Sequence, residues 1–201
     1  SILVITFFVR DLFDSLFLAF HHVAFQVASI ITTTGFATVD FNSWPTIPKT
    51  ILVLLMFIGA CAGSTGGGIK VSRIVLLFRS LTKELSQSLH PNQVRKIHFE
   101  GRAVEHVVLR SVNVFIAAYI LIFAISVLLI GIDNYDLVTN FTAVAATLNN
   151  IGPGLELVGP AQNFGLFSNF SKLVLTFDML AGRLELFPLL LLFYRGTWKR
   201  F

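Results

Sequence analysis

Residues 29–36 read Ser-Ile-Ile-Thr-Thr-Thr-Gly-Phe, and residues 149–154, Asn-Asn-Ile-Gly-Pro-Gly, repeat this stretch in weaker form. Each follows an apolar segment about as long as a helix that crosses half a membrane, and precedes a longer apolar segment with an interruption near its middle. Non-helical backbone at membrane depth is tolerated only where protein buries it or where it lines a watery cavity. Carbonyl oxygens of such a loop can replace the hydration shell of an ion. The order of helix, loop and broken helix therefore predicts two cation-coordinating loops inside a membrane.

The composition is that of an integral membrane protein. The chain has 201 residues, of which 55% are hydrophobic and 13% charged, and its mean hydropathy is +0.78, too apolar for an ordinary soluble domain. Residues 112–132 carry no charge and would form roughly 30 Å of helix, enough to cross the hydrocarbon core. The single cysteine, Cys61, excludes an internal disulfide framework. Because the sequence starts inside an apolar run without a signal peptide, we expect a fragment of a longer protein.

Two apolar segments of intermediate length precede the loops. Residues 16–31 predict a re-entrant helix that ends at the threonine run, and Asp11 or Asp14 is placed to cap its first turn. Residues 135–148 predict a second re-entrant helix ahead of the second loop. The C-terminal carbonyls of both helices would then point toward the loops, which is the favourable helix end for a cation.

Each loop is followed by an interrupted span. The first begins at Thr50, breaks over 59–68 and resumes over 69–81 as a helix. The break holds five glycines in ten residues, and each glycine costs a helix about 1 kcal/mol relative to alanine, so this segment must be unwound or hinged. The last span, 170–194, contains Gly182.

Equal spacing between matching features indicates an internal repeat. Gly152 lies 117 residues after Gly35, and Gly182 lies 115 residues after Gly67. Few residue identities accompany this spacing, so the spacing alone carries the inference. The chain accordingly divides into a first pore unit at 1–82, a basic connector at 83–106 and a second pore unit at 107–201.

The distribution of charge predicts the topology. Basic residues gather between the two units and at the C-terminus: Lys83, Arg95, Lys96, Arg102, Arg195, Lys199 and Arg200. The loop after Ile132 instead carries Asp133 and Asp136. Lysine and arginine concentrate in short cytoplasmic loops, so we expect 82–106 and the C-terminus on the cytoplasmic side.

Residues 63–70, Gly-Ser-Thr-Gly-Gly-Gly-Ile-Lys, superficially resemble a phosphate-binding loop. That motif requires Gly-Lys-Ser/Thr, whereas Ile69 separates Gly68 from Lys70 here and Val71 follows, which excludes an NTPase. Two interpretations remain. The glycines allow close packing against another helix, or they form a mobile constriction below an ion filter.

Arg183 lies in the middle of an apolar span, where a charge costs at least ~2.5 kcal/mol. It should therefore face an interior or an aqueous cavity, with either a functional role or a structural ion pair. Asp178 is one candidate partner, whereas Glu185 is only two residues away and points to another helix face. The adjacent His21 and His22 also point to different faces, which argues against a metal site.

Four motifs together resemble the Trk/Ktr/HKT superfamily of potassium transporters, and within it the bacterial TrkH-type subunits. They are the stretches at 29–36 and 149–154, Cys-Ala-Gly-Ser-Thr-Gly-Gly-Gly-Ile-Lys-Val at 61–71, and Met-Leu-Ala-Gly-Arg-Leu-Glu at 179–185. The resemblance covers nearly the whole chain but about half of such a protein. It implies an all-α integral membrane fold with four helix–pore helix–filter–helix repeats around a pseudo-fourfold pore. This chain would supply the third repeat, lacking most of its first helix, and the fourth.

The resemblance also implies which residues function. Backbone at two filter quarters would bind the substrate potassium: Thr33, Thr34, Gly35, Phe36, Asn150, Ile151, Gly152 and Pro153. An intramembrane gate would comprise Gly63, Ser64, Thr65, Gly66, Gly67, Gly68 and Arg183. Family members with serine at a filter glycine tend to favour sodium, so glycine at both positions favours potassium.

The same resemblance implies the setting. We expect a homodimer in the lipid bilayer of a bacterial inner membrane, with a cytoplasmic nucleotide-binding regulatory subunit of the TrkA type docked on the basic segment 70–102. No covalently bound cofactor and no nucleic-acid partner is expected.

The leading functional hypothesis is a potassium-conducting pore that follows the electrochemical gradient. The alternative is a proton- or sodium-coupled potassium symporter, for which Asp178 and Glu185 are the intramembrane carboxylate candidates. An enzyme is not expected, because the sequence lacks a nucleophile–base or metal-ligand constellation. A structural scaffold would not need two filter-like loops.

Overall fold

The computed structural model describes residues 1–59, 61, 63–64, 66–89, 97–99 and 102–183, and in these residues the chain is helical apart from one short hairpin. The α-helices are α1 (Ile2–Val9), α2 (Leu16–Ile31), α3 (Thr46–Ile58), α4 (Val71–Leu89), α5 (His106–Ile130), α6 (Leu137–Leu148) and α7 (Asn169–Arg183). Short 3₁₀ turns lie between them: η1 (Arg10–Leu12), η2 (Phe41–Ser43), η3 (Gly131–Asp133), η4 (Glu156–Val158) and η5 (Phe164–Leu166). The hairpin pairs β1 (His98–Phe99) with β2 (Arg102–Ala103) in antiparallel register.

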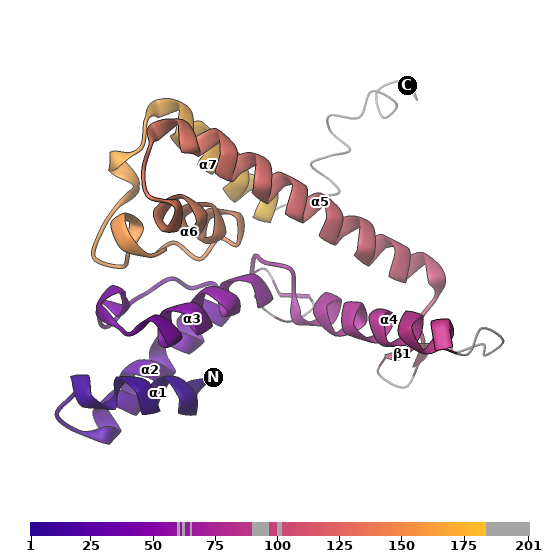
Figure 1. The fold of residues 1–201 in the computed structure, drawn as a ribbon, viewed down its shortest axis with the longest axis horizontal. Coiled ribbons are helices and arrows are strands. Elements are labelled where there is room, and N and C mark those ends of the chain that lie inside the picture. Colours follow the sequence, from indigo (N-terminus) through magenta and orange to yellow (C-terminus); the bar gives the residue numbers. More distant parts are fainter. Residues whose placement is uncertain (60, 62, 65, 90–96, 100–101, 184–201) are drawn as a thin grey trace.

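The helices form two groups joined by an extended arm (Figure 1). Helices α1, α2 and α3 pack together in the first group, and α5, α6 and α7 pack together in the second. Contacts between α3 and α6 bring the two groups side by side. Helix α4 runs out of the first group along α5, with the hairpin at its far end (Figure 1).

One helix among the described residues is long and apolar enough to cross a membrane, namely α5 with its 3₁₀ extension, His106–Asp133. Helices α2, α3 and α6 are apolar but shorter. Helices α2 and α6 both end at the last residue predicted for the two re-entrant helices, and α2 also begins at the predicted first residue, Leu16. Helix α7 follows the predicted last span as far as Arg183, while the rest of that span lies outside the described residues.

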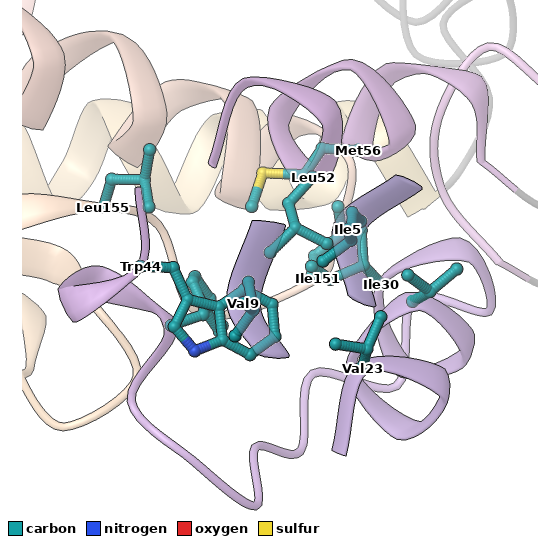
Figure 2. Close-up of a cluster of buried hydrophobic side chains, with 11 residues drawn as sticks. Ile5, Val9, Val23, Ile30, Trp44, Leu52, Met56, Ile151 and Leu155 are labelled. Carbon is teal, nitrogen blue, oxygen red and sulfur yellow. The ribbon is translucent and has the colours of Figure 1, made fainter. Parts of the chain in front are cut away.

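Side chains from the second group complete the core of the first (Figure 2). The buried cluster draws on α1, α2, α3 and the segment between α2 and α3, with Ile5, Val9, Val23, Val27, Ile30, Phe41, Trp44, Leu52 and Met56. Ile151 and Leu155, which follow α6, belong to the same cluster and are only 3% and 5% exposed. Full burial of such a side chain contributes about 1.5–3 kcal/mol, so apolar packing holds the two groups together next to the loops.

The first turn of α2 is capped differently from the prediction. The Ser15 Oγ accepts a hydrogen bond from the backbone N–H of Leu18 at 3.2 Å, so the cap is neither Asp11 nor Asp14. Serine is as good a cap as aspartate, and it lies nearer to the first apolar residue of the helix. In the second group an aspartate does cap α6, because Asp136 accepts from two backbone N–H groups.

Three helices begin or end outside their predicted limits. Helix α3 begins at Thr46 rather than Thr50, since Pro48 lies in the first turn, where its missing N–H leaves no hydrogen bond unmade. Helix α4 continues to Leu89 and enters the segment predicted as a connector, and α5 already begins at His106. The predicted limits were set where polar side chains interrupt the apolar pattern. A helix that presents one polar face to water continues past such residues.

Candidate functional site

The loops that follow α2 and α6 have the same backbone conformation. We call residues 33–36 the first loop and residues 150–153 the second loop. Thr33 and Asn150 open them with φ of +55° and +53°, and Gly35 and Gly152 follow at +80° and +113°. A residue other than glycine rarely has positive φ. Two such residues at matching positions, 117 residues apart, indicate that both units build the same turn.

Hydrogen bonds confirm that the two turns match. The backbone N–H of Thr34 donates to the carbonyl of Ser29 at 2.9 Å, and the N–H of Ile151 donates to the carbonyl of Ala146 at 2.9 Å. Both donors and acceptors are again 117 residues apart. Each bond folds the loop back onto the last turn of its short helix, so the helix end and the loop form one rigid piece.

The two loops touch through their backbones. A Cβ atom on Gly35 would lie 1.9 Å from the carbonyl oxygen of Ile151 and 3.4 Å from Cδ of Pro153. Since no real Cβ approaches an oxygen this closely, the contact requires glycine at position 35. A Cβ atom on the exposed Gly152 would have no atom within 4 Å, so its positive φ alone calls for glycine there.

Side chains anchor both loops to the surrounding helices. The Ser29 Oγ donates to the carbonyl of Phe36 at 2.7 Å, which holds the end of the first loop against α2. The Asn150 Nδ2 donates to the carbonyl of Met179 at 2.9 Å, which ties the start of the second loop to α7. These bonds fix the first loop to α2 and the second loop to α7.

The two glycine interruptions converge on the end of α6. A Cβ on Gly67 would lie 2.2 Å from the carbonyl oxygen of Asn149, and a Cβ on Gly182 would lie 1.9 Å from that of Leu148. The hydroxyl of Tyr119 donates to Oδ1 of Asn149 at 2.8 Å and fixes this helix end from α5. Close packing, one of the two interpretations of the glycine-rich segment, is therefore present in the structure.

A cavity of about 180 Å³ adjoins this helix end. Residues from the glycine-rich segment, from the start of α4 and from the end of α7 line it, among them Ser64, Gly66, Gly68, Lys70, Arg73 and Arg183. The structure thus brings Arg183 together with Ser64, Gly66 and Gly68 of the predicted gate. Thr65 lies outside the described residues, and Gly63 has nothing within 4 Å of where its Cβ would be.

The structure does not pair Arg183 with the candidate carboxylate of α7, Asp178. Arg183 is exposed to the cavity and forms no ion pair with Asp178. Asp178 is fully buried, where its Oδ1 accepts from the Ser126 hydroxyl at 2.7 Å and its Oδ2 has no hydrogen-bond partner among these residues. Glu185 lies outside the described residues.

The adjacent histidines of α2 have ordinary structural contacts. The Nδ1 of His22 is 3.0 Å from the Thr38 hydroxyl, and its ring stacks on Phe13. Across the described ranges, no group of three or more histidine, cysteine or acidic side chains is placed to hold a metal ion.

One link between the two units was not predicted. The side chain of Asn42 in η2 binds the backbone of Glu156 in η4, and Lys49 pairs with the Glu156 carboxylate at 3.5 Å. An asparagine in a polar segment predicts only a local turn, because the sequence holds no signal for a partner 114 residues away.

Comparisons with known proteins agree with this architecture. A family profile described as TrkH, cation transport protein, matches residues 11–197. The Trk system potassium uptake protein TrkH of Salmonella typhimurium is 43% identical over 190 residues, which are 94% of this chain and 39% of that protein. The protein TrkG of Escherichia coli is 36% identical over 181 residues, which are 90% of this chain and 37% of its own length.

A solved structure has the same fold. The crystal structure of the potassium transporter TrkH from Vibrio parahaemolyticus aligns with a TM-score of 0.89 at 42% identity and covers 98% of this chain. The match takes in 42% of that chain, and the chain described here spans about two fifths of the length of the curated relatives it matches.

Short helices that end in touching loops, beside a helix long enough to cross a membrane, define an all-α integral membrane protein. The chain belongs to the TrkH family of cation transport proteins. The resemblance drawn from the four sequence motifs and the predicted fold class are thereby confirmed.

Proposed function

We propose that this chain forms two quarters of a potassium-selective pore, with the first loop and the second loop as filter segments. One observation carries the proposal: two loops of equal conformation meet where Gly35 faces the carbonyl of Ile151. Two loops of separate function would not need both the same turn and a shared contact. Family relatives named potassium uptake proteins support potassium as the transported ion.

The loops supply the chemistry that a filter needs. Backbone carbonyls are neutral dipoles that replace water around a dehydrating potassium ion. Helices α2 and α6 each end at a loop, so the negative ends of their dipoles lie beside the ion path. The proposed ligand backbone comprises Thr33, Thr34, Gly35, Phe36, Asn150, Ile151, Gly152 and Pro153.

The cavity beside α6 fits a gate. Ser64, Gly66, Gly68 and Arg183 line the same space, and a positive charge there opposes the passage of potassium. Movement of the segment, of Arg183 or of both would change that barrier. The gate residues are therefore proposed as Gly63, Ser64, Thr65, Gly66, Gly67, Gly68 and Arg183.

The wider assembly follows the family. We propose a homodimer in a bacterial inner membrane, regulated by a cytoplasmic nucleotide-binding subunit of the TrkA type. Helix α4 and the hairpin offer it a basic surface, on which Arg79 donates to the carbonyl of His98 and lies over the ring of Phe99. The proposed role is transport and not enzymatic catalysis, and it involves no cofactor other than the substrate ion.

A second candidate is potassium uptake coupled to protons or sodium. The buried Asp178 favours it, because a carboxylate with one unpartnered oxygen in an apolar interior is costly when charged. Such a group gains from taking up a proton, as a coupling residue must. Glu185 remains the other carboxylate candidate.

The decisive experiment measures potassium and sodium flux into liposomes that hold the complete polypeptide, as the parent or as Gly152→Ser. Gly152 has room for a side chain but an unfavourable φ, so serine there changes the loop without a clash. Gly131→Ser is the matched control, because Gly131 also has open space but has helical φ of −58° at the end of α5. We expect potassium selectivity to fall by about tenfold in Gly152→Ser, roughly 1.4 kcal/mol of discrimination, and to persist in Gly131→Ser. Unchanged selectivity in both variants would mean that the second loop is not part of the filter.

A further inference from the structure

The side-chain amide of Asn42 binds the backbone of a single residue in the other unit. Its Oδ1 accepts from the N–H of Glu156 at 2.9 Å, and its Nδ2 donates to the carbonyl of Glu156 at 3.1 Å. Asn42 lies in η2, six residues beyond the first loop, and Glu156 lies three residues beyond the second loop. A pair of bonds in opposite directions fixes both the distance and the orientation of the two segments.

Further contacts hold this amide in place. Lys49, in the first turn of α3, lies 3.4 Å from the carbonyl of Asn42 and 3.5 Å from Oε1 of Glu156. On the other side Gly159 packs against the amide, since a Cβ there would lie 3.4 Å from Cγ of Asn42. The half-buried Asn42 side chain is therefore held between the two units by several contacts.

The backbone of Glu156 is in a conformation that only its surroundings can impose. Its φ is +53°, which a residue with a side chain rarely adopts. Such a conformation persists where neighbouring contacts over-determine it. The segment is also bound to its own short helix, because the N–H of Leu155 donates to the Thr142 hydroxyl of α6 at 3.0 Å. Glu156 thus joins a segment fixed to α6 with a segment fixed to α3.

We propose that Asn42 is a positioning residue that sets the geometry between the first loop and the second loop, and through it the selectivity for potassium. The proposal rests on the proposed function of these loops as filter segments. The contact of Gly35 with Ile151 and the burial of Ile151 and Leu155 in the core of the first group hold the two loops together. Apolar packing is non-directional and does not by itself set their relative orientation. The bridge from Asn42 to Glu156 adds two hydrogen bonds in opposite directions a few residues along the chain, and these set that orientation and with it the spacing of the loop carbonyls.

The test compares Asn42→Ala with Asn163→Ala in liposomes that hold the complete polypeptide. Asn163 is an exposed asparagine just before the 3₁₀ turn η5, and within the described ranges its Oδ1 accepts a local bond from the N–H of Gly165, at 2.8 Å, with no bond to the other unit. We expect Asn42→Ala to lower the ratio of potassium to sodium flux by roughly fivefold, about the net effect of one hydrogen bond. Asn163→Ala should keep the parental ratio at equal protein amount. A merely structural role for Asn42 would lower the yield of folded protein but leave this ratio unchanged.

Two further variants separate the possible failures. Asn42→Asp keeps the acceptor for the N–H of Glu156, loses the donor and places a carboxylate near Lys49, so it should fold and show an intermediate ratio. If the Asn42→Ala variant does not fold, the Asn42→Asp variant takes its place in the test. Gly152→Ser, measured in parallel, reports on the filter itself. If Gly152→Ser loses selectivity while Asn42→Ala and Asn42→Asp keep it, the positioning role is wrong and the filter stands. If none of the three loses selectivity, the proposed filter is wrong.

Discussion

Alanine at Gly35 and at Gly152, introduced one at a time, measures the contact between the first loop and the second loop. Both glycines have positive φ, so alanine is strained at either position by roughly 1–2 kcal/mol. The available space differs. The new Cβ would lie 1.9 Å from the carbonyl oxygen of Ile151 in Gly35→Ala, whereas nothing lies within 4 Å in Gly152→Ala. Both variants therefore carry backbone strain, and Gly35→Ala adds a steric clash to it.

The size of the clash sets the expected difference. An ordinary contact to a Cβ begins near 3.4 Å, so the gap in Gly35→Ala must open from 1.9 Å by movement of backbone on both sides. Overpacking of this kind costs typically about 1–3 kcal/mol. We expect a destabilisation of about 1–2 kcal/mol in Gly152→Ala and of about 2–5 kcal/mol in Gly35→Ala.

Thermal unfolding of the complete polypeptide in detergent checks this expectation, with potassium flux in liposomes as the second assay. The midpoint of Gly35→Ala should lie clearly below that of Gly152→Ala, and its flux should be the lower of the two. Equal midpoints would mean that the first loop does not rest on Ile151. The shared contact, on which the pore proposal depends, would then be refuted.

Two other predictions concern α7. Gly182→Ala should lower the unfolding midpoint, because its Cβ would lie 1.9 Å from the carbonyl of Leu148 and overpacking costs about 1–3 kcal/mol. The control Gly131→Ala has open space and a helical φ, so it should shift the midpoint little. Equal shifts in the two variants would contradict the packing of α7 on α6. Asp178→Asn should keep potassium flux within about twofold of the parent if the pore is passive, since asparagine keeps an oxygen that accepts from the Ser126 hydroxyl and removes only the charge. Loss of a potassium-driven change in internal pH, reported by a dye inside the liposomes, would instead favour coupled uptake.

Local features of the site could be predicted because they are written in adjacent residues. Helix α2 occupies the apolar run expected for it, and both short helices end at the residue before a small polar or threonine stretch. The spacing of 117 residues between Gly35 and Gly152 predicted two similar turns, and the dihedral angles and hydrogen bonds agree with it. The helix ends and the two turns depend on the side chains of neighbouring residues alone.

Contacts between the units could not be predicted in the same way. The polar residues around Asn42 are compatible with any solvent-exposed turn, and nothing near Glu156 in the sequence marks its positive φ. Which turn meets which depends on how the helices pack, and that follows from the sum of many apolar contacts. The limits of α4 were missed for a related reason, because its polar face suggested a connector where the structure has a helix.

The two glycine interruptions match in sequence spacing but not in their partners, and this difference bears on the proposed gate. Gly182 packs on Leu148, the last residue of the short helix in its own unit. An equivalent Gly67 would pack on Ile31, the last residue of α2, yet its nearest atoms belong to Asn149 in the second unit. Simple close packing within a repeated unit would give equivalent partners in both. The glycine-rich segment instead crosses to the neighbouring helix end, so a movement of that segment would change contacts at Asn149, the residue before the second loop, as well as in its own unit, which is what the proposed gate requires.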